Sequence, residues 1–272
     1  MKSLPLLPKG TASLISSEEK EKTVTDNLYD KIAPFYAALN KDVPYEKMAA
    51  HIQKILALHG IKEGDTLLDL GCGSGNLTLP LLRLGYDMIG VDASFSMLSE
   101  ARNSEGAERV LWLCQDATEL DLYGTVKGTV SSLDTLNHIT DKEDVKKVLR
   151  LVHTFLEPGG LFIFDINSPY KFSTVYGENA YILENEDAFC AWQNHYDKKK
   201  GLCDFFVTVF ERDGKHYRRY DTYAAERVYS LDEMEAMLKE AGFRLLSITD
   251  GYSDKPVKED TLRFTVTAEA CK

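Results

Sequence analysis

Short apolar runs recur between residues 66 and 166 and are separated by stretches with helical spacing. The runs predict strands at 66–70, 88–91, 110–114, 129–133 and 161–166. Each run is apolar at nearly every position rather than at every second one, which is typical of strands buried on both faces. Alternation of such strands with helices predicts an α/β fold built on a parallel sheet that helices cover on both sides.

The predicted helices carry start and stop signals. A helix over 45–59 has apolar residues at helical spacing and ends at Gly60. A second helix, over 140–156, begins with Thr140 and Glu143 at the spacing of a capping box and ends before a Pro-Gly-Gly turn. These signals place the helices between the strands, as the α/β pattern requires.

The alternation stops after residue 167. Segments 189–196, 202–212 and 216–228 are strand-like, and Asp213-Gly214 is a hairpin signal between the last two. We expect these segments to form an antiparallel insert. A helix that begins with Ser230 and Glu233 at capping-box spacing follows, and segments 243–249 and 262–268 supply two further strands.

A glycine-rich loop, Gly71-Cys72-Gly73-Ser74-Gly75, follows the first predicted strand directly. Glycines allow a tight turn and let a ligand approach backbone N–H groups at the carboxyl end of the sheet. Asp92 ends the next strand, seventeen residues after Gly75. A carboxylate there can accept hydrogen bonds from both hydroxyls of a ribose, so the pattern predicts an adenosine-bearing ligand.

The spacing of the glycines separates two classes of such ligand. Dinucleotide-binding proteins carry GxGxxG, whereas this loop reads GxGxG, with Asn76 at the place of the third glycine and Asp69 two residues before the first. The spacing favours a methyl donor that carries adenosine. An NAD(P)-dependent oxidoreductase is the alternative.

The segment Leu68–Gly75 resembles the first motif of class I S-adenosylmethionine-dependent methyltransferases. Later segments are similar to the family's further motifs and follow in the same order: 90–97, 115–117, 156–160 and 240–243. Within the family, the chain is most similar to small-molecule enzymes related to ubiquinone and sugar-amine methyltransferases.

The resemblance implies a Rossmann-like seven-stranded sheet with a reversed final β-hairpin. It also implies an antiparallel β insert at 168–229 that covers the substrate, and an N-terminal helical lid. Residues 1–24 are expected to be a flexible N-terminus, and 25–272 the methyltransferase domain.

The resemblance further implies which residues bind S-adenosyl-L-methionine. Asp69 and the glycine loop would contact the methionine end, Asp92 the ribose and Asp116 the adenine. The expected set is Tyr29, Tyr36, Asp69, Gly71, Cys72, Gly73, Asp92, Ala93, Met97, Gln115, Asp116, Ala117 and Leu133.

Methyl transfer from a sulfonium is an in-line displacement that needs positioning and, for a protonated acceptor, a base. His138, which follows the fourth strand, is the candidate general base because it titrates near neutral pH. Residues expected to contact a small-molecule acceptor are Asn137, Trp192, His195, Arg219 and Tyr220.

The sequence pattern does not determine whether a nitrogen, an oxygen or a carbon atom of the acceptor is methylated. It does not determine the oligomeric state either. A module that binds the donor without transferring methyl is a further alternative.

Composition narrows the partners and the compartment. The net charge is −11, from 32 Lys and Arg against 43 Asp and Glu, which disfavours nucleic acid as a partner. The five cysteines include no CxxC pair, so we expect no metal site, and their odd number fits free thiols in the cytoplasm. The sequence contains no run of about 18 apolar residues, so we predict no membrane-spanning helix.

Overall fold

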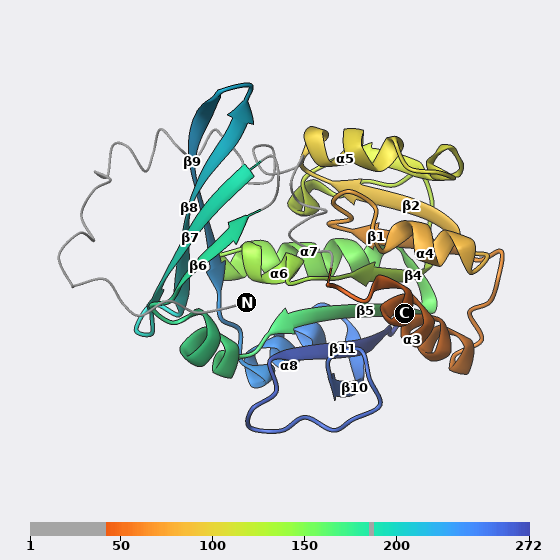
Figure 1. Ribbon diagram of the computed structural model, residues 1–272. Coiled ribbons are helices and arrows are strands. Elements are labelled where there is room, and N and C mark those ends of the chain that lie inside the picture. Colours follow the sequence, from red (N-terminus) through yellow and green to blue (C-terminus); the bar gives the residue numbers. More distant parts are fainter. Residues whose placement is uncertain (1–41, 185–187) are drawn as a thin grey trace.

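The computed structural model describes residues 42–184 and 188–272, which contain two separate β-sheets (Figure 1). The larger sheet has the strand order β10-β11-β5-β4-β1-β2-β3. Its strands are β1 (Thr66–Leu70), β2 (Asp87–Asp92), β3 (Leu111–Cys114), β4 (Val126–Ser131), β5 (Leu156–Asn167), β10 (Phe243–Asp250) and β11 (Arg263–Ala270). The smaller sheet is antiparallel and consists of β6 (Ala180–Glu184), β7 (Ala188–Asp197), β8 (Leu202–Asp213) and β9 (His216–Arg227).

Helices connect these strands. The α-helices of the described residues are α3 (Tyr45–Leu58), α4 (Thr78–Arg83), α5 (Phe95–Arg102), α6 (Thr135–His138), α7 (Lys142–Phe155) and α8 (Leu231–Glu240). Two 3₁₀ turns, η1 (Ala107–Arg109) and η2 (Ala117–Glu119), and a π-helix, η3 (Lys171–Tyr176), complete the set. In this part of the chain, no helix has the length and apolar character needed to cross a membrane.

The pairing of the larger sheet confirms the predicted α/β fold. β1 pairs in parallel with β2 and β4, whereas β11 runs antiparallel to both β5 and β10. The chain moves outward from β1 in one direction through β2 and β3, and in the other through β4 and β5. The loops after β1 and β4 therefore flank the switch point of the topology, where such sheets bind ligands. Figure 1 shows β5 running toward the smaller sheet.

Apolar side chains cover both faces of the larger sheet. Within β5, Phe162 and Phe164 pack with residues of α7 and α8, whereas Ile163 packs with residues of α3 and α4. All three side chains are buried. This two-sided burial explains why the strands are apolar at successive positions.

One of the two predicted helix caps differs from the structure. Helix α7 is capped by Asp141, whose side chain accepts a hydrogen bond from the backbone N–H of Glu143, so the predicted cap at Thr140 was wrong. The carbonyl oxygen of Thr140 instead accepts a hydrogen bond from Arg227, which holds it outside the helix. The predicted capping box of Ser230 and Glu233 at α8 is confirmed.

The observed boundaries of β4 and β5 differ from the predicted ones. β4 ends at Ser131, before the predicted 133, because Leu133 has a left-handed backbone. β5 begins at Leu156, five residues before the predicted start, with an irregularity in its pairing to β4. α6, β6 and η3 were not predicted as separate elements.

The hairpin predicted at Asp213-Gly214 joins β8 to β9, with Gly214 at φ +62°. The predicted antiparallel arrangement after residue 167 is thus confirmed. The expected lid with Tyr29 and Tyr36, and residues 1–24, lie outside the described residues.

Candidate functional site

The glycine loop turns sharply between β1 and α4. Gly71 has φ +74° and Gly73 has φ +53°, a region that favours glycine. A Cβ on Gly71 would lie 2.4 Å from Cγ2 of Thr135, so the loop is in close contact with the start of α6. The segments that follow β1 and β4 are therefore in contact at the switch point.

Asp92 fixes the loop to the end of β2. One carboxylate oxygen accepts a hydrogen bond from the backbone N–H of Gly73 at 2.8 Å, and the other from that of Ser94 at 2.8 Å. Asp92 is partly exposed, which leaves it accessible to a ligand.

Asp69 is a buried carboxylate with one partner missing. Its Oδ2 accepts a 2.6 Å hydrogen bond from the hydroxyl of Thr78, but its Oδ1 is buried and has no hydrogen-bond partner among the described residues. Burial raises the pKa of Asp69 to about 7; the Thr78 hydrogen bond opposes this shift and the charge of Asp92 adds to it. A buried acceptor without a donor is costly, and an ammonium group of a bound ligand would supply one.

The expected adenine side consists of the turn after β3. Asp116 is exposed, and its Oδ1 accepts 2.7 Å hydrogen bonds from the N–H and the hydroxyl of Thr118. The side-chain amide of Gln115 pairs in both directions with the backbone of Asp121, at 3.1 Å each. Gln115 therefore shapes this turn, whereas the exposed Asp116 has room to contact a ligand.

The apolar residues expected around the donor differ in exposure. Met97 is buried, and its Cε would lie 3.1 Å from a Cβ on Gly73, so its side chain packs against the glycine loop. Ala93 is exposed and Ala117 partly buried. Cys72 is buried, and burial raises the pKa of its thiol well above the ordinary value. Its side chain packs into the core and leaves only backbone for a ligand.

A strained turn follows β4. Leu133 and Asp134 have φ +54° and +62°, which are uncommon for residues with a side chain. Their backbone N–H groups donate to Oδ2 and Oδ1 of Asp165, both at 2.8 Å. Asp165 also accepts hydrogen bonds from Tyr252, at 2.6 Å, and from Arg263. Strain of this kind costs about 1–3 kcal/mol per residue and is concentrated at functional sites.

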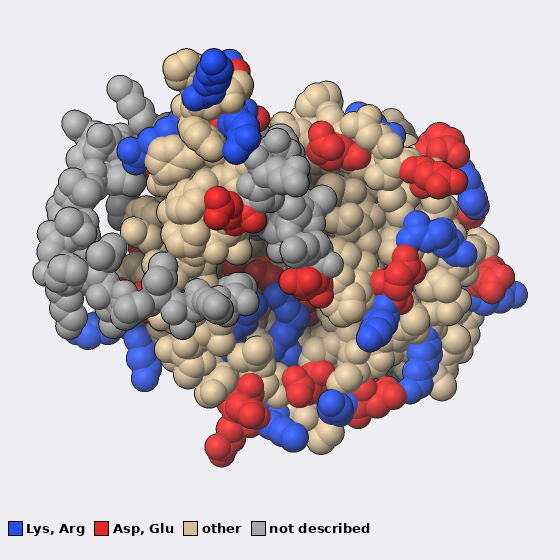
Figure 2. Space-filling model, viewed as in Figure 1, with Lys and Arg blue, Asp and Glu red and all other residues tan. Residues whose placement is uncertain are grey.

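A group of polar side chains, which we call the junction cluster, lies where β5 meets the smaller sheet. Its members are Asp134, His138, Asp165, Asn167, Lys171, Glu226 and Arg263. Arg263 donates to Asp134 at 2.6 Å, and Nδ2 of Asn167 donates to Asp134 at 3.0 Å and to Glu226 at 2.9 Å. Figure 2 shows acidic and basic side chains close together in the recess near the end of β5.

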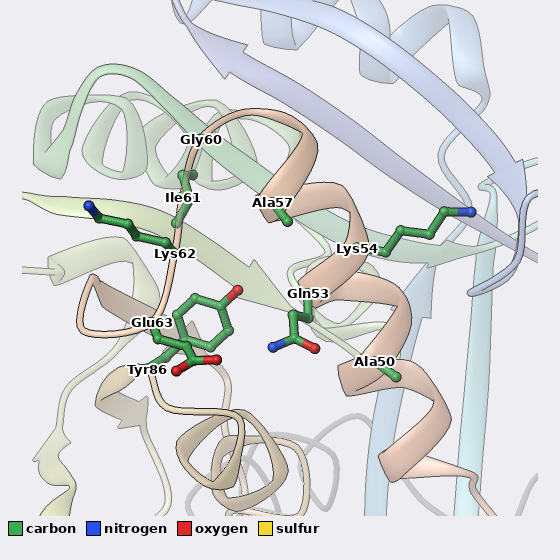
Figure 3. Close-up of a pocket in the computed structure, with 9 residues that line it drawn as sticks. All are labelled: Ala50, Gln53, Lys54, Ala57, Gly60, Ile61, Lys62, Glu63 and Tyr86. Carbon is green, nitrogen blue, oxygen red and sulfur yellow. The ribbon is translucent and has the colours of Figure 1, made fainter.

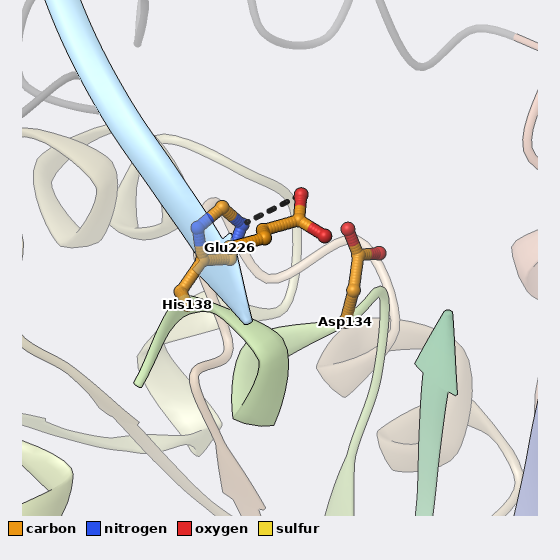
Figure 4. Close-up of side chains that lie close together, drawn as sticks. All are labelled: Asp134, His138 and Glu226. Atoms are coloured by element: carbon orange, nitrogen blue, oxygen red, sulfur yellow. Dashed lines mark ion pairs between the residues drawn. The ribbon is translucent and has the colours of Figure 1, made fainter. Parts of the chain in front are cut away.

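His138 lies at the edge of this cluster. Its Nε2 is 3.8 Å from Oε1 of Glu226, and its side chain is 23% exposed against 4% for Glu226 (Figure 4). Burial lowers the pKa of His138, and the charge of Asp134 opposes the shift. His138 is thus neutral near pH 7, the state in which an imidazole accepts a proton.

Asn137 is fully buried, and both ends of its amide are used within the protein. Its Oδ1 accepts from the backbone N–H of Asn167 at 2.9 Å, and its Nδ2 donates to the carbonyl of Arg227 at 2.8 Å. The residue predicted to contact the acceptor therefore ties α6 to β5 and to β9.

The smaller sheet presents two different faces. Cys203 lies opposite both Tyr196 and Glu226, so the strand alternation places Trp192 and Tyr220 on the same face as Glu226. Tyr220 is six residues from Glu226 along β9, or about 20 Å, too far to share one small ligand with it.

His195 and Arg219 lie on the opposite face. His195 is 2.9 Å from Glu178, and Arg219 is 2.9 Å from Asp221, with both side chains more than half exposed. The structure does not bring these two residues together with the junction cluster.

The sequence analysis missed most of the junction cluster. Asp165, Asn167, Lys171, Glu226 and Arg263 come from β5, η3, β9 and β11. One signal was available: Asp165 is an acid within the otherwise apolar run 161–166. The other members lie in segments where polar residues are common, so nothing in the sequence distinguishes them.

A separate cavity of about 580 Å³ lies beside α3 (Figure 3). Its lining includes Gly60, Ile61, Lys62 and Glu63, which precede β1, and Tyr86, which precedes β2. It is therefore at the amino ends of the strands, at the opposite edge from the glycine loop.

Comparison with known proteins agrees with this geometry. A family profile described as a methyltransferase domain matches residues 67–160, from β1 to the start of β5. The crystal structure of an S-adenosylmethionine-dependent methyltransferase from Clostridium acetobutylicum ATCC 824 is 34% identical, with a TM-score of 0.80, and the match covers 90% of this chain and 100% of that one.

Two further relatives carry specific names. A demethylmenaquinone methyltransferase from Symbiobacterium thermophilum is 29% identical over 84% of this chain and 87% of its own length. The sugar N-methyltransferase KedS8 from Streptoalloteichus is 17% identical with a TM-score of 0.72, over 90% of this chain and 94% of that one, and shares the fold. The geometry of the glycine loop, Asp69 and Asp92 agrees with the similarity to the Clostridium protein. The chain therefore belongs to the class I S-adenosylmethionine-dependent methyltransferases.

Proposed function

We propose that this methyltransferase modifies a small molecule, bound between α6 and the face of the smaller sheet that carries Glu226. The names of two relatives specify demethylmenaquinone and a sugar, which supports a small acceptor. The net charge of −11 and the mixture of acidic and basic side chains in Figure 2 support it over nucleic acid. In this proposal the smaller sheet covers the acceptor.

The observation that carries the donor site is the unpaired Oδ1 of Asp69. It is buried at the end of β1, where an ammonium group would complete its hydrogen bonding. The glycine loop also contacts the start of α6, where a Cβ on Gly71 would lie 2.4 Å from Cγ2 of Thr135, and α6 ends at His138. The proposed donor and acceptor sites are therefore neighbours.

The protein's contribution to the reaction is mainly positional. When bound, S-adenosylmethionine supplies a methyl group that is already activated by its sulfonium. Gly71, Gly73 and Asp69 would hold its methionine end, Asp92 its ribose and Asp116 its adenine, with Leu133 at the side of the reacting centre. Correct placement of two reactants can contribute about 7–11 kcal/mol.

His138 is the proposed general base. It is neutral near pH 7, partly exposed, and beside the strained turn that follows β4. Its Nε2 would take the proton that an N–H or O–H acceptor must release.

Calorimetry tests the donor half of the proposal. S-adenosylhomocysteine should bind the wild-type chain, and Asp92→Ala should weaken binding about 10- to 100-fold, because charged hydrogen bonds contribute about 1.5–3 kcal/mol. NADH should not bind. Unchanged affinity in Asp92→Ala would remove that residue from the site, and turnover of a labelled donor separates an enzyme from a binding module.

A further inference from the structure

The junction cluster contains more acidic than basic side chains. Its three carboxylates are Asp134, Asp165 and Glu226, and its two cations are Arg263 and Lys171. Arg263 pairs directly with Asp134 and Asp165. Among the described residues no Lys or Arg forms an ion pair with Glu226, and its one ion-pair partner is His138, at 3.8 Å.

Glu226 is therefore the least neutralised carboxyl group of the cluster. Its Oε2 accepts one hydrogen bond from Asn167, and its Oε1 is directed at His138. Burial and the charge of Asp134 raise its pKa well above the ordinary value, although the hydrogen bond to Asn167 and the charges of Lys171 and Arg263 oppose the shift. A cation beside Oε1 would stabilise its charged form.

We propose that Glu226 determines acceptor specificity by binding the ammonium group of an amine between its Oε1 and Nε2 of His138. This inference rests on the proposed function and names the acceptor class that the site would take. His138 is the partly exposed residue of the pair, and Glu226 is the buried one that carries the negative charge when the amine is bound. The nitrogen of the acceptor would then lie beside the turn at Leu133 and Asp134.

A divalent metal ion fits the same position less well. Asp134, His138 and Glu226 place ligand atoms within 4.8 Å of one another. Both oxygens of Asp134, however, accept hydrogen bonds, from Arg263 and from Asn167, and Asn167 also occupies Oε2 of Glu226. Both oxygens of Asp134 and one oxygen of Glu226 are thus already engaged, and two positive side chains lie beside them, whereas metal sites use at least three protein ligands in most cases.

The proton balance follows from an ammonium acceptor. R–NH₃⁺ first loses one proton to the pair of His138 and Glu226, which leaves a nitrogen lone pair. That lone pair forms the N–CH₃ bond while the C–S bond breaks and its electrons remain on sulfur. The product is R–NH₂⁺–CH₃, so one proton is left on the pair and passes to solvent.

The test compares amines with alcohols of the same shape, such as an amino sugar and its parent sugar. Binding of each member of such pairs is measured by calorimetry with saturating S-adenosylhomocysteine. We expect wild type to prefer the amines at least tenfold, and Glu226→Gln to remove this preference while its affinity for S-adenosylhomocysteine changes less than twofold. Glu211→Gln is the matched control, because Glu211 lies on the same face of the same sheet, where it accepts a hydrogen bond from the hydroxyl of Tyr220.

Three results would overturn the inference: no amine binding more tightly than its alcohol, an unchanged preference in Glu226→Gln, or binding that requires Mg²⁺ and is lost with a chelator. If Glu226→Gln does not fold, Glu226→Asp, which keeps the charge but shortens the side chain, should weaken amine binding and leave alcohol binding unchanged. Failure of wild type to bind S-adenosylhomocysteine would instead refute the proposed function itself.

Discussion

The carboxylate of Asp165, at the end of β5, accepts a 2.8 Å hydrogen bond from the backbone N–H of Leu133, beyond the end of β4. This bond, with its neighbour to Asp134, holds two residues in a left-handed backbone. Leu133 stands at the expected methionine end of the donor. A carboxylate of β5 thus shapes the turn that follows the neighbouring strand, β4.

Asp165→Asn should distort this turn and destabilise the protein. The amide NH₂ would face a backbone donor, and Arg263 would lose one of its two carboxylate partners, so we expect the free energy of unfolding to fall by about 3–5 kcal/mol. Urea denaturation measures this change, and calorimetry should show at least tenfold weaker binding of S-adenosylhomocysteine.

Asp87→Asn is the control for that variant, because Asp87 is exposed at the amino end of β2. It should change neither quantity. Wild-type stability and affinity in Asp165→Asn would show that the turn does not depend on this carboxylate.

Gly71→Ala should disrupt the contact between the glycine loop and α6. The added Cβ would lie 2.4 Å from Cγ2 and 2.6 Å from Oγ1 of Thr135, at a φ that alanine adopts at a cost. We expect a lower melting temperature and loss of S-adenosylhomocysteine binding. Adding Thr135→Ala removes both contact atoms and should restore part of the affinity, because only the backbone strain and a tight Cβ contact remain. A double variant no better than Gly71→Ala would show that this steric contact is not the cause.

The raised pKa of Asp69 predicts a specific pH dependence of stability. The folded protein keeps this proton up to about pH 7, whereas the unfolded chain releases it near pH 3.8. The native state therefore binds more protons across this window, so the contribution of Asp69 to stability falls as the pH rises through it and is constant above. Asp69→Asn should remove this part of the slope in urea denaturation measured from pH 4 to pH 8.

Donor binding should follow the same group in the opposite direction. Because the ionised carboxylate attracts an ammonium group, wild-type affinity for S-adenosylhomocysteine should increase as the pH rises from 5.5 to about 7. In Asp69→Asn the affinity should be lower and nearly independent of pH. Parallel pH profiles for the two proteins would exclude Asp69 from donor binding.

His138→Gln separates chemistry from donor binding. With a general base removed, kcat should fall about 10²- to 10⁴-fold, while affinity for S-adenosylhomocysteine is retained. The pH profile of kcat should lose the step that belongs to His138. An unchanged kcat would mean that the proton leaves by another route.

Local sequence patterns predicted the expected donor-binding residues, whereas the junction cluster depends on contacts between residues far apart in the sequence. The glycine loop and Asp92 lie within a short stretch of chain, and the loop's spacing restricts both the backbone and the ligand. Asp134 and Arg263 are 129 residues apart and meet only because β11 inserts beside β5. No spacing in the sequence encodes that pairing.

The smaller sheet shows a second limit of sequence reasoning. Alternation along β7 and β9 is readable from the sequence, but which face meets the main sheet depends on the packing of Glu226 against Asn167. His195 and Arg219 were predicted to contact the acceptor, and the strand alternation places them on the face opposite Glu226. At α7, Thr140 and Asp141 are both suitable caps, and the contact of Thr140 with Arg227 decided between them.

A crystal structure of the complex with S-adenosylhomocysteine tests the central claim most directly. The account predicts the amino group within hydrogen-bond distance of Oδ1 of Asp69, the ribose hydroxyls on Asp92, and the sulfur between the glycine loop and Leu133. A ligand bound elsewhere, such as in the cavity beside α3, or one that leaves Asp69 and Asp92 without contacts, would contradict it.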